Sequence, residues 1–265
     1  MIGFLMKLEL RLEVARKYKS PAQRARVLTQ AWIGENMYCP SCKAERIEQA
    51  VEGEKVIDFV CPDCYEPFQL KSKKGKFHGR VVDAAYKPMI DAIEHGNVPS
   101  FFFLNYSSEL WRVRDLFLVP RYFISLSAIE RRKKLRPSAR RAGWQGCNIL
   151  LDRLPQEARI YVVSEYEAIP SNDVRNRWRQ FSFLKQASSS SRGWTTDVLA
   201  CVRKLGQETF TLSDVYGFED CLSGLHPLNK NVRPKIRQQL QVLRDHGIIK
   251  FLGNGKYTVT IPSQS

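Results

Sequence analysis

Cys39-Pro-Ser-Cys42 is followed after 18 residues by Cys61-Pro-Asp-Cys64, so the chain carries two cysteine pairs with the same internal spacing. Two residues between thiols let a tight turn present both sulfurs to one ion, and two such turns complete a tetrahedron. A disulfide pair or chance cysteines are the alternatives, but Cys147, Cys201 and Cys221 are scattered as free thiols would be. The spacing therefore predicts a structural zinc site with no open position for catalysis, with the ligands Cys39, Cys42, Cys61 and Cys64.

An acidic residue and a Gln-x-Lys motif lie on either side of the second cysteine pair. Asp58 lies in a β-branched and aromatic run, residues 56–60, and residues 65–71 are typical of a returning strand. On that strand Gln69 and Lys71 share one face. If the cysteine turn reverses the chain, Asp58 and Gln69 meet and can bind one Mg²⁺, with Lys71 beside the attacking water. The alternative for so short a pattern is a solvated strand end followed by a basic loop.

The charge balance indicates a polyanionic partner. Lys and Arg number 42 against 27 Asp and Glu, which gives a formal net charge of +15. A membrane surface would also attract this charge, but no apolar stretch approaches the ~20 residues that span a bilayer. Residues 1–10 are too short, and too soon interrupted by Lys7 and Glu9, for a signal peptide. We expect a soluble, intracellular protein that is a monomer in solution and cuts nucleic acid.

The length and composition allow one large domain and a smaller one. The chain has 265 residues, of which 43% are hydrophobic, and a serine tract at residues 187–191 is typical of a flexible linker. We place the domain border there, which gives domains 1–187 and 188–265.

The larger domain is expected to be a mixed sheet flanked by helices, of the α+β or α/β class. Ser20-Pro21 predicts the start of a helix that runs to about Asn36, and residues 80–95 are predicted to be helical up to Gly96. The strand candidates are residues 100–106, 116–119, 148–151 and 159–163.

A basic loop at residues 131–147 contains a single aromatic residue. Its arginines, which include Arg136, Arg140 and Arg141, can neutralise phosphates, and Trp144 offers a wide apolar face to a base. Packing of Trp144 at the edge of the core is the alternative.

The C-terminal region predicts a winged helix. Helices are expected at residues 193–205, after a cap at Ser213, and at 231–246, and residues 247–260 form a hairpin around Gly-Asn-Gly-Lys. In the third helix Ile236, Leu240 and Leu243 form the buried stripe. Its opposite face can lie in the major groove of DNA while Lys256 touches the backbone. A winged helix that binds protein is the alternative.

Several segments together resemble the DpnI family of methyl-directed restriction endonucleases, over nearly the whole chain. They are Ile57-Asp58-Phe59, Cys61-x-x-Cys64, residues 68–75, Ala139-Arg-Arg-Ala-Gly-Trp144-x-Gly-Cys-Asn-Ile149, Ser190-Ser-Arg-Gly-Trp-Thr195 and residues 235–245. The segment at 139–149 is far more specific than any nuclease motif. The resemblance implies a PD-(D/E)xK nuclease domain with a zinc site, joined to a winged helix.

The resemblance also implies an activity, which is Mg²⁺-dependent blunt cleavage of double-stranded DNA at G-N6-methyladenine-TC in a bacterial cytoplasm. Asp58 and Gln69 would hold the metal, Lys71 would serve the water, and Trp144 would contact the methylated adenines. Gln69 departs from the glutamate of the family, so we expect activity with weaker Mg²⁺ binding. The expected DNA contacts are Lys73, Lys74, Arg136, Arg140, Arg141, Trp144, Arg192, Trp194, Arg233, Lys235, Arg237, Gln238 and Lys256.

Two other functions fit the same motifs. One is a zinc-ribbon and winged-helix transcription regulator that does not cleave. The other is a repair or junction nuclease that selects DNA by its structure.

Overall fold

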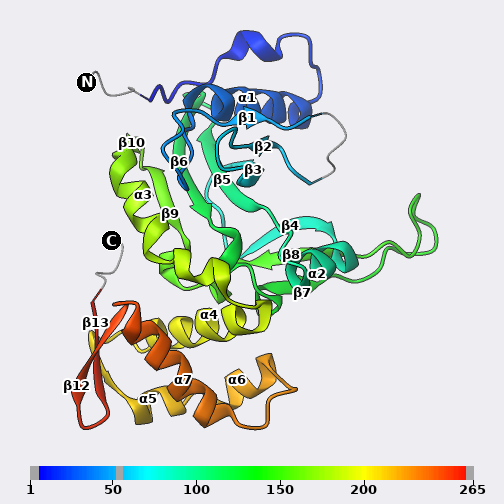
Figure 1. The fold of residues 1–265 in the computed structure, drawn as a ribbon. Helices are drawn as coiled ribbons and strands as arrows, with labels where there is room; N and C mark the ends of the chain where they lie inside the picture. The colour runs from blue at the N-terminus through cyan, green and yellow to red at the C-terminus, as the bar shows by residue number, and fades with distance from the viewer. Residues whose placement is uncertain (1–5, 52–55, 261–265) are drawn as a thin grey trace. The chain divides into compact units, whose positions relative to one another are not determined.

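The computed structural model describes residues 6–51 and 56–260 and divides the chain into two compact units (Figure 1). Unit 1 comprises Met1–His78, Pro99–Arg121 and Arg159–Ser182, and unit 2 comprises Gly79–Val98, Tyr122–Ala158 and Phe183–Ser265. Unit 2 therefore combines two internal segments of the first 187 residues with the C-terminal region. The domain border between residues 187 and 188 remains a prediction from the sequence.

A seven-stranded mixed sheet forms the centre of unit 1, which confirms the predicted fold class. β3 and β5 run parallel, and the other neighbouring strands are antiparallel. In spatial order the strands are β1 (Glu48–Gln49), β2 (Phe59–Val60), β3 (Pro67–Lys74), β5 (Ser100–Ser107), β6 (Arg112–Val119), β9 (Ile160–Ser164) and β10 (Glu167–Ala168).

The core of unit 1 is built on β5, the middle strand of this sheet. Phe101, Phe102, Phe103 and Leu104 are all fully buried, because helices and loops cover both faces of the strand. α1 (Pro21–Asn36) packs against β3, and α3 (Ser171–Gln180) packs against β9. The helix predicted from Ser20-Pro21 to Asn36 is confirmed, with Pro21 in its first turn.

The predicted helix at residues 80–95 is wrong in its first half. β4 (Arg80–Ala85) precedes α2 (Tyr86–Glu94), and Val81 lies opposite Ile149 in an antiparallel pair. Two consecutive valines favour a strand, and their burial alternates, with Val81 buried and Val82 exposed. A partner strand more than 60 residues further along the chain therefore determines the conformation.

A second, three-stranded sheet in unit 2 has the order β4, β8 and β7. β7 (Ile129–Arg131) and β8 (Gly146–Leu150) are antiparallel and enclose the predicted basic loop. Short 3₁₀ turns complete the chain in both units: Leu12–Ala15, Arg121–Phe123, Leu126–Ala128, Leu151–Arg153, Gln156–Ala158 and Ser182–Gln186.

The C-terminal part of unit 2 has the helices and hairpin of a winged helix, as predicted. Its sheet has the order β11, β13 and β12, and the wing turns through Asn254 and Gly255, both at positive φ. Its elements are α4 (Ser189–Lys204), β11 (Thr209–Thr211), α5 (Leu212–Tyr216), α6 (Glu219–Leu225), α7 (Val232–Asp245), β12 (Ile249–Gly253) and β13 (Lys256–Val259).

Two local predictions in this region are wrong. The serine tract is not a flexible linker, because Ser188 Oγ accepts a bond from Ser191 N at 3.3 Å and α4 starts at Ser189. The cap of α5 is Thr211 and not Ser213. Thr211 Oγ1 accepts from Asp214 N at 3.2 Å, and Asp214 Oδ2 accepts from Thr211 N at 2.7 Å, which completes a capping box.

Candidate functional site

Asp58 is held just before β2 by donors from two different elements. The strand predicted at residues 56–60 is shorter than expected, since β2 contains only Phe59 and Val60. Phe59 lies opposite Phe68 of β3, so the antiparallel register brings Asp58 beside Gln69. Leu70 N donates to Asp58 Oδ2 at 2.7 Å, and Gln30 Nε2 of α1 donates to Asp58 Oδ1 at 3.2 Å. Each carboxylate oxygen therefore has one donor that fixes its direction.

Gln69 presents an oxygen that nothing in the described part of the chain satisfies. Its Oε1 atom is buried and accepts no hydrogen bond there. A buried acceptor without a donor is costly, and in a native protein it calls for a partner such as water or an ion. One carboxylate and one amide oxygen are hard ligands that Mg²⁺ accepts alongside water and phosphate. The residues present therefore fit a Mg²⁺ site.

Lys71 follows two residues later and projects from the same face of β3 as Gln69. Its side chain is half-buried, and Nζ lies 5.8 Å from the centre of the Phe101 ring on the neighbouring strand. α1 supports the same strand, because Thr29 Oγ1 donates to Ser72 Oγ at 3.0 Å. The structure thus places Asp58, immediately before β2, beside Gln69 of β3, and Lys71 lies two residues further along β3.

The four cysteines of the two pairs form one cluster in unit 1. Their sulfur atoms all lie within 4.8 Å of one another. Cys39 Sγ is 3.6 Å from Cys64 Sγ, and Cys42 Sγ is 3.5 Å from Cys61 Sγ. Tetrahedral bonds of ~2.3 Å from zinc would put sulfurs roughly 3.8 Å apart. All four thiols are free, so the cluster could bind a metal ion and is not a disulfide pair.

Backbone amides surround the sulfurs. Ser41 N donates to Cys39 Sγ at 3.3 Å, and Ala44 N donates to Cys42 Sγ at 3.4 Å. Burial raises the pKa of the Cys39 thiol. At Cys61 burial also opposes ionisation, but the backbone N–H groups of Cys64 and Asp63, together with the side chains of Cys42 and Cys39, outweigh it and lower the pKa. The amides thus favour the thiolates that a metal needs.

Arg175 is a supporting residue that no sequence motif indicates. From α3, its Nε donates to Cys39 O and its Nη2 to Ala44 O, both at 3.1 Å. Its guanidinium also lies 4.8 Å from the centre of the Tyr38 ring. Only the folded chain reveals this role, because Arg175 is one of many arginines and lies more than 110 residues from each of the four cysteines.

The basic loop between β7 and β8 is exposed along most of its length, and Trp144 is half-buried at its end. The Arg141 guanidinium lies 4.7 Å from the centre of the Trp144 ring. A Cβ atom at Gly146 would lie 2.7 Å from the same ring, so this close packing requires glycine. The six-membered ring of the indole therefore packs on Gly146 of β8, and Arg141 lies over the indole. Arg136 and Arg140 are exposed nearby in sequence.

α7 exposes a polar, basic face opposite its buried residues. Ile236, Leu240 and Leu243 are fully buried, as predicted. Arg233 Nε donates to Glu219 Oε2 and Arg237 Nη1 donates to Tyr216 Oη, each at 2.7 Å. Lys235 Nζ instead donates to Gln238 Oε1 at 2.8 Å. Lys256 is exposed in the wing and Lys73 and Lys74 lie at the end of β3.

Trp194 does not fit the expectation that it contacts DNA. Its side chain is 2% exposed, and its ring stacks on His226 with centroids 4.0 Å apart. We correct this expectation and assign Trp194 to the core of unit 2. Arg192, two residues earlier, is half-buried, and its Nη1 donates to Ala187 O at 3.4 Å.

These features define a protein with a mixed α/β domain, a four-cysteine cluster and a winged helix-turn-helix region. A family model described as DpnI, Dam-replacing family, matches residues 6–187, and a model described as Dam-replacing HTH domain matches residues 190–259. The chain therefore belongs to the DpnI (Dam-replacing) family of methyl-directed restriction enzymes, which confirms the resemblance seen in the sequence. Its HTH domain implies DNA binding.

Among the described residues, no helix is both long and apolar enough to cross a membrane.

Proposed function

We propose that this chain is a type II site-specific deoxyribonuclease that cleaves double-stranded DNA at G-N6-methyladenine-TC. The reaction is Mg²⁺-dependent phosphodiester hydrolysis that leaves blunt ends. The observation that carries the proposal is the buried, unsatisfied Gln69 Oε1 beside the oriented carboxylate of Asp58, in a chain of this family.

Asp58 and Gln69 hold the Mg²⁺ in this proposal. The ion supplies Lewis-acid stabilisation of the phosphate when it is bound. Lys71, on the same face of β3, orients the attacking water and stabilises the negative charge that develops on the phosphate. The two donors on Asp58 keep its carboxylate directed toward the site without an energetic cost at the moment of reaction.

Cys39, Cys42, Cys61 and Cys64 hold a structural Zn²⁺. The second cysteine pair forms the turn between β2, which Asp58 immediately precedes, and β3, which carries Gln69. Loss of the metal would therefore misalign the catalytic residues as well as destabilise the domain.

Two surfaces bind the DNA. Arg136, Arg140, Arg141 and Trp144 act from the basic loop, and α7 and Lys256 act from the winged helix in the C-terminal domain, residues 188–265. An N6-methyl group adds apolar area in the major groove, worth ~0.8 kcal/mol when buried. Each palindrome contains two methyl groups. Recognition of each of them by both domains gives a usable preference for methylated over unmethylated DNA. The protein acts as a monomer in solution, in restriction-modification defence in the bacterial cytoplasm.

A two-plasmid digest tests this function. The full chain, supplied with Mg²⁺, should linearise adenine-methylated plasmid and leave unmethylated plasmid intact. Asp58→Ala should abolish cutting and retain binding to methylated duplex, because the carboxylate holds the metal and not the DNA. Cutting by Asp58→Ala at the wild-type rate would remove Asp58 from the site.

A regulator that binds without cutting is the second candidate, and Gln69 favours it because an amide brings no negative charge to the metal. Binding of methylated DNA without cleavage by both the wild type and Gln69→Glu would support the regulator. Equal cutting of both plasmids would instead indicate a nuclease that does not recognise methylation.

A further inference from the structure

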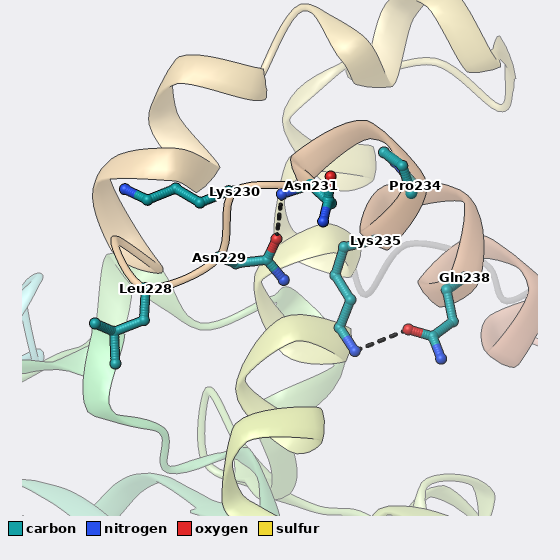
Figure 2. A pocket seen from close by; sticks show the side chains of 7 residues that line it. All are labelled: Leu228, Asn229, Lys230, Asn231, Pro234, Lys235 and Gln238. Carbon is teal, nitrogen blue, oxygen red and sulfur yellow. Dashed lines mark hydrogen bonds between the residues drawn. The ribbon is translucent and has the colours of Figure 1, made fainter.

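Lys235 and Gln238 lie side by side on one face of α7, one helical turn apart. Lys235 Nζ donates to Gln238 Oε1 at 2.8 Å (Figure 2). Gln238 is exposed and Lys235 is half-buried, and both line a hollow of about 570 Å³ at the start of α7. In a helix-turn-helix domain the N-terminal residues of the recognition helix contact base edges in the major groove. The pair therefore occupies a position from which it can contact a base.

A buried amide fixes the orientation of the Gln238 side chain. The next residue, Gln239, is 1% exposed, and its Oε1 atom accepts from Thr195 Oγ1 of α4 at 2.7 Å. Because that bond engages the oxygen, the Nε2 group of Gln239 is left to donate, and it donates to Gln238 Oε1 at 3.5 Å. Gln238 Oε1 thus accepts from two neighbours. The Nε2 group of Gln238 is the end that can meet a ligand.

The pair presents hydrogen-bond donors and no free acceptor. A lysine ammonium has three donors and no acceptor, and Lys235 uses one of the three on Gln238. The Gln238 oxygen is engaged, and within the described ranges its Nε2 group donates to no acceptor. The oxygen and nitrogen of one amide are bonded to the same carbon, so Lys235 Nζ and Gln238 Nε2 lie close together. They form a double donor.

A double donor matches the major-groove edge of guanine. Guanine offers two neighbouring acceptors there, O6 and N7, whereas adenine has an N6–H donor in place of O6. Glutamine can contact adenine with both ends of its amide, but that contact requires a free oxygen. Gln238 does not have one, because its oxygen is held by Lys235 and Gln239. The arrangement therefore favours guanine over adenine.

We propose that Lys235 and Gln238 recognise the guanine of the G-N6-methyladenine-TC site from the winged helix, by donating from Nζ and Nε2 to its O6 and N7 atoms. This assignment rests on the proposed function and deepens it, because it names the base that this face of α7 contacts.

Two modified bases test the contact. The dissociation constant of the full chain is measured for methylated GATC duplexes, in buffer without divalent cations so that no cleavage occurs. In one duplex 7-deazaguanine replaces guanine, so that N7 becomes a C–H group. In another 2,6-diaminopurine, paired with thymine, replaces O6 with an amino group and keeps N7. Each change should weaken binding of the wild type by about fivefold, the effect of ~1 kcal/mol.

A double variant assigns the loss to the pair. Lys235→Met combined with Gln238→Met removes both donors and keeps long side chains. It should bind the unmodified duplex less tightly and lose most of the penalty for the two modified bases. Gln241→Met is the matched control, because Gln241 is an exposed glutamine of α7 that does not line the hollow. It should keep the full penalty. The melting temperatures of the variants should match that of the wild type, because neither Lys235 nor Gln238 is buried.

The outcomes separate this inference from the proposed function. A wild type that binds methylated and unmethylated GATC duplexes equally would contradict the proposed function. A wild type that prefers the methylated duplex but tolerates both modified guanines would overturn the guanine contact alone. A double variant that keeps the full penalty would also overturn it, since another residue would then recognise the guanine and the pair would contact only phosphate.

Discussion

Gln30 Nε2 donates a 3.2 Å hydrogen bond to Asp58 Oδ1, so a side chain of α1 holds one oxygen of the carboxylate whose other oxygen accepts from Leu70 N. Gln30 acts through Asp58 and is a positioning residue. Gln30→Ala should lower the cleavage rate by about tenfold, since a hydrogen bond to a charged group is worth ~1.5 kcal/mol or more. It should also raise the Mg²⁺ concentration at half-maximal rate and leave DNA affinity unchanged.

The matched control is Gln23→Ala, an exposed glutamine of the same helix. Gln30→Ala with wild-type rate and Mg²⁺ dependence would show that Leu70 N alone orients the carboxylate.

Gln69→Glu should strengthen Mg²⁺ binding, because it returns a negative charge to the buried ligand position. The Mg²⁺ concentration at half-maximal cleavage rate should fall by roughly tenfold. Without Mg²⁺ the variant should melt at a lower temperature than the wild type, since its carboxylate would be buried beside Asp58. Mg²⁺ should then raise its melting temperature more than that of the wild type. An unchanged response to Mg²⁺ in both measurements would count against Gln69 as a ligand.

Trp144→Ala should reduce the preference of the full chain for methylated over unmethylated duplex, because the indole is the single aromatic surface in the basic loop. Arg237→Ala should weaken binding to both duplexes together and reduce the salt slope by roughly one, as expected for a phosphate contact. Titration at several salt concentrations separates the two effects. If Trp144→Ala weakens both duplexes equally, Trp144 packs on the hairpin and does not recognise the methyl group.

Arg203 and Glu157 form a buried ion pair in unit 2, with side chains 14% and 4% exposed. Arg203→Met should lower the free energy of unfolding by about 3 kcal/mol, because it leaves the Glu157 carboxylate buried without its partner. Combining it with Glu157→Gln should restore part of the loss. Arg244→Met, which removes an exposed pair with Asp245, should change stability by less than ~1 kcal/mol. Denaturant unfolding measures the stability of all three variants. Equal losses of stability from Arg203→Met and Arg244→Met would contradict the larger contribution expected from the buried pair.

Thiol titration of the native, zinc-loaded protein should find Cys221 reacting first, because it is exposed. Burial raises the pKa of Cys201 to about 12, so that thiol should remain unreactive until the protein unfolds. A chelator should add the four cluster thiols to the reactive set. Cys221→Ser should remove the first phase, and a native protein whose cluster thiols react without a chelator would argue against bound zinc.

The sequence by itself determined features that depend on nearest neighbours along the chain. The paired cysteines required only their own spacing, and local composition was sufficient to predict the strand at residues 100–106, which forms β5. The buried stripe of α7 followed from helical periodicity, since a 3.6-residue repeat places Ile236, Leu240 and Leu243 on one face.

Only the tertiary structure decided features that depend on distant partners. Residues 80–85 form a strand because β8 pairs with them, and Asp58 is oriented by Gln30 and Leu70. Trp194 lies in the core and Leu228 is exposed, although both are large apolar residues of the same region. Local sequence cannot distinguish these cases, because burial and hydrogen bonding are settled by which surfaces meet after the chain has folded.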